Sequence, residues 1–206
     1  MSVSLLANAI QEELQSFRTP PEKHVAPVPK VGDRAPESAQ LSWPSGRPTI
    51  IVFLRHCGCP FAEKTFRALT ALSTTHPEIH CIAITQASQA VTDKWIIDVG
   101  GEWDADVVAD PARDLYAQWG LGLSSAWYAM GPGAVYSALR LGRDEGIWNR
   151  LTTAEGGNRW QVGGAFGVDP AGFVRWVCVG GGVGEVPAFE EGVEALGRPA
   201  GVGLAA

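Results

Sequence analysis

The sequence has little charge, few cysteines and no hydrophobic run of membrane-spanning length. Charged residues make up 18% of its 206 residues and hydrophobic ones 46%, a balance typical of a globular chain with a substantial core. The apolar run at residues 49–54 is strand-sized, whereas a membrane span needs about 20 residues. The first residues also lack the basic start and long apolar stretch of a signal peptide. We therefore expect one cytoplasmic globular domain with modest extensions.

The charge balance and the cysteine count argue against several classes of protein. A net charge of −6 opposes general attraction to nucleic acid or to an anionic membrane, because both partners need a basic face. Four cysteines are too few for a disulfide framework in a chain of this length. We therefore expect small-molecule partners, and any special cysteine to be reactive or metal-bound rather than structural.

Hydrophobic periodicity, together with glycine and proline, predicts the order of helices and strands. An amphipathic helix at residues 5–17 and a proline-rich arm at 19–36 precede the core. The next predicted elements are a strand at 49–54, a helix from Pro60, a strand at 80–85, a helix capped by Ser88, a strand at 107–109 and a helix from Asp110 to about 119. The last are a tryptophan- and glycine-rich insertion at 121–161 with a short helix near 134–141, a hairpin at 162–179 and a helix at 187–196.

This order is that of the thioredoxin fold, an α/β architecture with a central mixed sheet flanked by helices. We divide the chain into an N-terminal helix and arm (1–30), a thioredoxin-like domain (31–196) and a disordered tail (197–206). We hypothesise that the N-terminal helix mediates contact between two copies of the chain in a homodimer.

Cys59 is the strongest candidate for chemistry, because it lies between a buried strand and a helix that opens at Pro60. Unpaired N–H groups and the helix dipole at such a position favour an anion, so the thiol is expected to ionise readily. His56, Arg55 and Lys64 are predicted to add positive charge nearby. The alternative is a small buried cysteine that packs and does not react.

Cys57 lies two residues earlier and has two possible roles. A disulfide with Cys59 would close a small, strained ring, and strained disulfides are oxidising. Cys57 would then resolve an oxidised Cys59, or else it points into the core from the end of the strand. Cys81 and Cys178 lie inside predicted strands and are interpreted as packing residues.

Other chemistries are weakly supported by the sequence. The cysteines and histidines do not follow a standard zinc spacing, and no dinucleotide-binding or serine-nucleophile motif is present, so we expect neither metal nor cofactor. Arg159 precedes Trp160 and the hairpin, and in a thioredoxin fold that strand runs beside the start of the catalytic helix. The eight tryptophans either belong to the core or wall an apolar pocket.

Four segments carry a family resemblance: residues 32–36 (GDRAP), 53–61 (FLRHCGCPF), 110–116 (DPARDLY) and 159–166 (RWQVGGAF). They resemble the AhpC/TSA-type, peroxiredoxin-like branch of the thioredoxin superfamily. We take Cys59, Cys57, His56 and Arg159 as the candidate catalytic residues, and expect Arg159 or His56 to hold the thiolate and polarise the leaving oxygen. The expected substrate pocket includes Arg55, Pro60, Phe61 and Trp160.

The chain departs from the family pattern at two places. Ala62 stands where members often carry a second cysteine, which leaves Cys59 as a single thiol unless Cys57 substitutes. Peroxiredoxins carry threonine three residues before the reactive cysteine and proline seven residues before it, where this chain has His56 and Val52.

Two classes of function follow. The first is a thiol-dependent antioxidant oxidoreductase in which the Cys59 thiolate attacks a hydroperoxide or disulfide. The second is a thioredoxin-fold scaffold repurposed as a cofactor-free enzyme or binding protein for an apolar metabolite. A redox sensor without turnover is a third, weaker hypothesis.

Overall fold

The sheet of this protein has five strands in the order β3-β2-β1-β4-β5. The computed structural model describes residues 19–21, 23–41, 46–124, 131–150, 154–179 and 186–197. The strands are β1 (Thr49–Phe53), β2 (His80–Thr85), β3 (Ala105–Ala109), β4 (Gly164–Val168) and β5 (Val174–Val179). The pairs β1–β2 and β2–β3 are parallel, whereas β1–β4 and β4–β5 are antiparallel. The predicted mixed sheet is therefore present.

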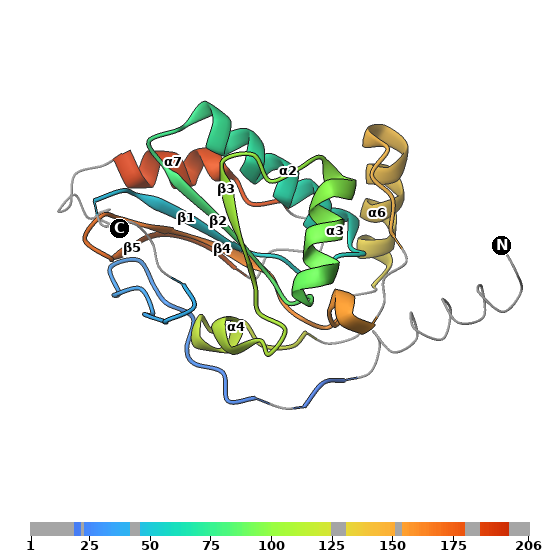
Figure 1. Cartoon of the computed structure of the whole chain (residues 1–206), viewed down its shortest axis with the longest axis horizontal. Helices are drawn as coiled ribbons and strands as arrows, with labels where there is room; N and C mark the ends of the chain where they lie inside the picture. Colours follow the sequence, from blue (N-terminus) through green and yellow to red (C-terminus); the bar gives the residue numbers. More distant parts are fainter. Residues whose placement is uncertain are drawn as a thin grey trace, which may run out of the picture.

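Both faces of the sheet are covered, as the unbroken apolar run of β1 predicts. Ile50 and Val52 face one core, which α2 (Pro60–Thr75), α3 (Gln89–Val99), α6 (Pro132–Glu145) and α7 (Phe189–Gly197) help to enclose. Ile51 and Phe53 face a second core on the other side, with residues of α4 (Asp114–Gln118). Figure 1 shows α2 and α7 on one side of the sheet and α4 on the other. Among the described residues, no helix is long and apolar enough to cross a membrane.

Local signals in the sequence set most element boundaries correctly. Pro60 opens α2 at its first position, where a missing N–H costs nothing. The Ser88 side chain accepts a hydrogen bond from the Val91 N–H and caps α3, and Gly100 ends that helix in the left-handed conformation. The strand at β3 begins two residues earlier than predicted, at Ala105.

The start of α4 was predicted wrongly. The helix begins at Asp114 rather than at Asp110, because Arg113 has a φ of 61° and interrupts helical geometry. Asp110 still caps this helix, but its carboxylate reaches forward to the N–H groups of Asp114 and Leu115, at 3.0 and 2.8 Å.

The insertion is more helical than predicted. Helix α6 covers Pro132–Glu145 rather than only residues 134–141, since Pro132 starts it and Gly146 ends it in the left-handed conformation. The predicted helix at 5–17 and nearly all of the tail at 197–206 lie outside the described residues. The described part of the arm lies along α4, where the Ala26 N–H donates to the Ala117 carbonyl at 2.9 Å.

A buried carboxylate ties α2 to the segment that follows α6. Glu63, whose side chain is only 2% exposed, accepts hydrogen bonds from Arg150 at 2.9 and 3.2 Å and from Arg67 at 2.6 Å. Burial alone would raise the pKa of Glu63, but the hydrogen bonds and charges of Arg150 and Arg67 together outweigh it. The pKa therefore lies below its ordinary value.

We predict that Glu63→Gln destabilises the protein by about 1–3 kcal/mol at pH 7, because it removes charge-assisted hydrogen bonds from a buried site. A pKa that falls on folding contributes stability above the ordinary carboxyl pKa and loses it as pH falls through the folded value. The difference between variant and parent should thus shrink toward pH 3, measured by urea unfolding. Glu102→Gln, on an exposed side chain, is the matched control. A penalty that is the same at both pH values would contradict this role of Glu63.

Candidate functional site

Three segments meet at one end of the sheet. Strands β1 and β2 both finish there, and β4 begins there because Gly164 pairs with Phe53 in the antiparallel register. Gln86, which follows β2, donates hydrogen bonds to the carbonyls of Arg55 at 2.7 Å and Asn158 at 2.8 Å. The residues after β1 and the residues before β4 are therefore held against each other.

Cys59 lies in this region as the N-cap residue of α2, with extended backbone angles and Pro60 directly after it. It is 4% exposed and lines a cleft of about 160 Å³. Peptide N–H groups and the helix dipole at such a position stabilise negative charge. The cleft is also lined by Arg55, His56, Pro60, Phe61, Ala134, Val135, Ala138, Asn149 and Arg159.

Arg55 contacts the thiol directly. Its Nη1 atom lies 3.8 Å from Cys59 Sγ, and its Nη2 atom donates to the Arg159 carbonyl at 3.2 Å. The sequence analysis expected Arg55 to line the substrate pocket and to add positive charge nearby, but expected Arg159 or His56 to hold the thiolate. The structure gives that contact to Arg55.

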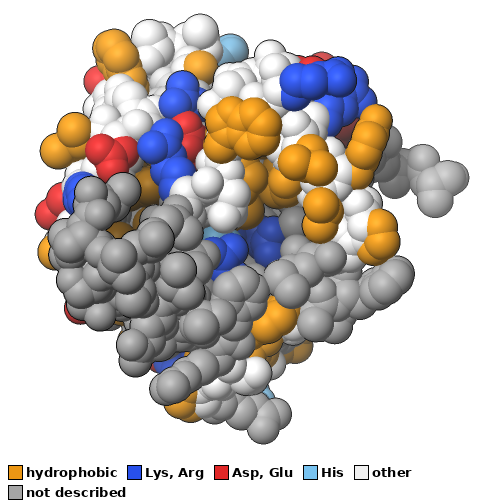
Figure 2. Space-filling view, turned by 90° about the vertical axis from the view of Figure 1, so that its right-hand side faces the viewer, with side chains coloured by type: hydrophobic (Ala, Val, Ile, Leu, Met, Phe, Trp, Pro, Cys, Tyr) orange, Lys and Arg blue, Asp and Glu red, His pale blue; other side chains and the backbone are white. Residues whose placement is uncertain are grey.

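Two arginines bring positive charge to the cleft. Arg55 and Arg159 line it, and its described lining includes no carboxylate. Burial lowers the pKa of Arg159, although a guanidinium remains protonated at neutral pH. Figure 2 looks onto the face that carries α6, where blue side chains lie in a hollow below hydrophobic ones. An anion is thus favoured beside Cys59.

His56 is not the positive charge that the sequence suggested. Burial, with a smaller effect from the charge of Arg55, lowers the pKa of His56 to about 3. The ring is therefore neutral at physiological pH, and its Nδ1 atom accepts a hydrogen bond from the Gly58 N–H at 3.1 Å. Lys64, also expected to add charge here, pairs instead with Glu145 of α6.

Cys57 belongs to the apolar core that contains β1 and α2. It is 8% exposed, and burial raises the pKa of its thiol to about 12, although a hydrogen bond with Thr85 opposes the rise. All four cysteines are free thiols. Cys81 is fully buried in the same core, and Cys178 packs against it half-buried.

Of the eight predicted site residues, six line the cleft: Cys59, His56, Arg159, Arg55, Pro60 and Phe61. Cys57 and Trp160 do not. Trp160 is half-buried, and its carbonyl accepts hydrogen bonds from the N–H and hydroxyl groups of Ser124. The sequence analysis missed Gln86 and the wall formed by α6. A buried polar residue directly after a strand could have pointed to Gln86, whereas no local signal places α6 beside Cys59.

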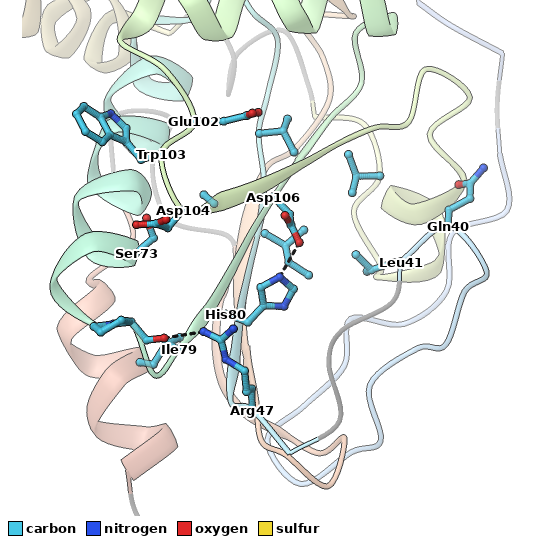
Figure 3. A pocket seen from close by; sticks show the side chains of 15 residues that line it. Gln40, Leu41, Arg47, Ser73, Ile79, His80, Glu102, Trp103, Asp104 and Asp106 are labelled. Atoms are coloured by element: carbon cyan, nitrogen blue, oxygen red, sulfur yellow. Dashed lines mark hydrogen bonds and ion pairs between the residues drawn. The ribbon is translucent and has the colours of Figure 1, made fainter.

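A second hollow of about 840 Å³ lies beside β2 and β3. Figure 3 shows His80 joined to Asp106 within it, by a hydrogen bond of 2.7 Å from Nε2. The described residues that line this hollow include no cysteine. Nor does any group of histidine, cysteine and carboxylate side chains in the described part of the chain form a set that could hold a metal ion.

Solved structures similar to this one have low sequence identity but cover most of the chain. A peroxiredoxin-like protein from Aquifex aeolicus is 16% identical over 84% of this chain and 88% of its own, with a TM-score of 0.56. A thiol peroxidase from Chromobacterium violaceum is 14% identical over 84% and 88%, with a TM-score of 0.54. A PrxQ mutant from Xylella fastidiosa is 11% identical over 82% and 94%, with a TM-score of 0.55. These likenesses confirm the predicted thioredoxin-like fold.

No curated protein matches the chain. The family described as AhpC/TSA antioxidant enzyme matches residues 67–181, which is more than half of the sequence and begins after Cys59. The chain therefore belongs to the AhpC/TSA antioxidant enzyme family.

Proposed function

We propose that this protein is a thiol peroxidase in which the Cys59 thiolate reduces a hydroperoxide. The observation that carries the proposal is the contact of 3.8 Å between the Arg55 guanidinium and Cys59 Sγ. The thiol also stands at the N-terminus of a 16-residue helix, so helix and guanidinium favour the same charge state. Family membership supports a thiol-dependent redox role in general.

The proposed reduction of a hydroperoxide needs no cofactor, because the thiolate and external thiols supply all the electrons. The thiolate attacks the terminal oxygen of the hydroperoxide, an S–O bond forms, and the O–O bond breaks. Cys59 becomes a sulfenic acid, oxidised by two electrons, and the peroxide is reduced to an alkoxide that takes a proton from water. An external thiol then condenses with the sulfenic acid to a mixed disulfide and releases water. A second thiol attacks that disulfide and restores Cys59.

An external thiol is needed to reduce the sulfenic acid because Cys57 is buried in the core. A resolving cysteine must reach the sulfenic acid as a reactive thiol, whereas Cys57 is packed in the core with a raised pKa. We therefore assign Cys57 a packing role and Cys59 the chemistry. A disulfide substrate in place of the hydroperoxide would use the same thiolate.

A second candidate function is binding or conversion of an apolar metabolite on this scaffold. Phe61, Ala134, Val135 and Ala138 give the cleft an apolar wall beside the thiol. Such a wall suits an apolar ligand whether or not Cys59 reacts with it. Retained ligand binding and turnover in a Cys59→Ser variant would favour this alternative.

We predict that Cys59→Ser abolishes reaction with hydrogen peroxide, whereas Cys57→Ser leaves most of it intact. The measurement is intact-mass spectrometry after brief exposure to stoichiometric peroxide with a sulfenate-trapping reagent, followed by peptide mapping. The parent protein should carry one trap at Cys59. A mass lower by two hydrogen atoms, mapped to a disulfide between Cys57 and Cys59, would instead identify Cys57 as a resolving thiol. An unreacted Cys59 would refute the peroxidase proposal.

We also predict that Arg55→Met slows sulfenate formation at Cys59 by about 100- to 1,000-fold, the effect of removing one preorganised electrostatic donor. Stopped-flow kinetics with hydrogen peroxide provide the rate constant. Arg55→Lys should be intermediate, because it keeps the charge but loses the planar fork that also reaches the Arg159 carbonyl. Arg34→Met, at an exposed position, should leave the rate unchanged. Equal rates for Arg55→Met and the parent would rule out this role of Arg55.

A further inference from the structure

His56 combines burial, a fixed hydrogen bond and access to the cleft. The residue is 4% exposed, yet it lines the cleft that contains Cys59. The Gly58 N–H donates to its Nδ1 atom at 3.1 Å. A backbone N–H can only donate, so Nδ1 must present its lone pair. In a neutral ring the single proton then sits on Nε2.

The turn around Gly58 holds this arrangement in place. The Cys57 N–H donates to Gly156, the Cys59 N–H donates to the His56 carbonyl, and the Arg150 N–H donates to the Gly58 carbonyl, at 3.0, 2.9 and 3.0 Å. A Cβ atom on Gly58 would lie 2.5 Å from the Arg150 carbonyl oxygen, so only glycine permits this approach. The donor to Nδ1 therefore cannot shift easily.

The other ring nitrogen, Nε2, is the one that faces no hydrogen-bond partner among the described residues. His56 Nε2 makes no hydrogen bond within the described part of the chain. It is also not one of the fully buried polar atoms that lack a partner there, such as Arg55 Nε and His80 Nδ1. Nε2–H is thus an unused donor accessible from the cleft that His56 lines.

We propose that His56 is a catalytic residue that donates a hydrogen bond from Nε2–H to the hydroperoxide, as a fixed neutral donor rather than as an acid. This role rests on the proposed peroxidase function. When the O–O bond breaks, negative charge develops on the departing oxygen, and a preorganised donor stabilises it. The imidazole keeps its proton, and the alkoxide is protonated by water.

Two substitutions separate the two nitrogens of His56. The amide of His56→Asn occupies the place of Nδ1 and can accept from Gly58, but it removes the N–H group at the position of Nε2. The longer amide of His56→Gln places an N–H group near the position of Nε2. We expect His56→Asn to slow sulfenate formation by hydrogen peroxide about 100- to 1,000-fold, and His56→Gln to recover most of that loss.

Alkylation of Cys59 by iodoacetamide is the control reaction, because it tests the thiolate without a peroxide oxygen. His56→Asn should alkylate at the parental rate, and His24→Asn, at an exposed position, should behave like the parent in both reactions. The donor role would be overturned if His56→Asn slowed both reactions equally, or if it did not slow the reaction with peroxide. In either case, a parent protein that reacts with peroxide would still support the peroxidase function. A parent protein inert to peroxide would overturn both.

The tautomer can be measured apart from activity. In full-length protein labelled with nitrogen-15 at histidine, the NMR spectrum at neutral pH should show His56 with its proton on Nε2 and a bare Nδ1. A proton on Nδ1, or on both nitrogens, would refute the inference.

Discussion

The antiparallel pairing of β1 with β4 is the constraint on which the rest of the site depends. Because Phe53 pairs with Gly164, the chain that leaves β1 must run beside the chain that enters β4. The hydrogen bonds from the Cys57 N–H to the Gly156 carbonyl and from Arg55 Nη2 to the Arg159 carbonyl follow from that register. A shift of one residue would turn the side chains of β1 toward the opposite core and separate these groups. Sheet register thus sets the geometry around the thiol.

The basic side chains at this end of the molecule differ in whether a carboxylate pairs with them, and this difference sets the charge of the cleft. Arg150 lies near Gly58, but the buried carboxylate of Glu63 neutralises its charge. Lys64 is neutralised by Glu145. Arg55 and Arg159 line the cleft, whose described lining includes no carboxylate, and His56 adds a neutral ring. Positive charge is therefore present beside the thiol.

The sequence predicted the fold and the position of Cys59 because both depend on local signals: a β-branched run, a proline at a helix start and glycines at helix ends. It placed the start of α4 wrongly because nothing in an arginine side chain signals the positive φ that Arg113 adopts before the helix. It gave His56 a charge because burial is not visible in sequence. It assigned the thiolate contact to Arg159 or His56 rather than to Arg55 because the direction of a long side chain depends on partners such as the Arg159 carbonyl, far away in the chain.

The family match begins after the turn that carries Cys59. It covers residues 67–181 and contains β2 to β5, whereas the turn at 55–60 lies before them. The case for chemistry at Cys59 therefore depends on the physics of that turn. Arg55 Nε is buried with no hydrogen-bond partner in the described part of the chain, and a buried unpaired donor of this kind costs about 1–3 kcal/mol or more. A guanidinium held at that cost, with Nη1 toward a thiol, is stabilised when an anion stands in front of it. The thiolate and the developing alkoxide are the two anions that the proposed reaction places there.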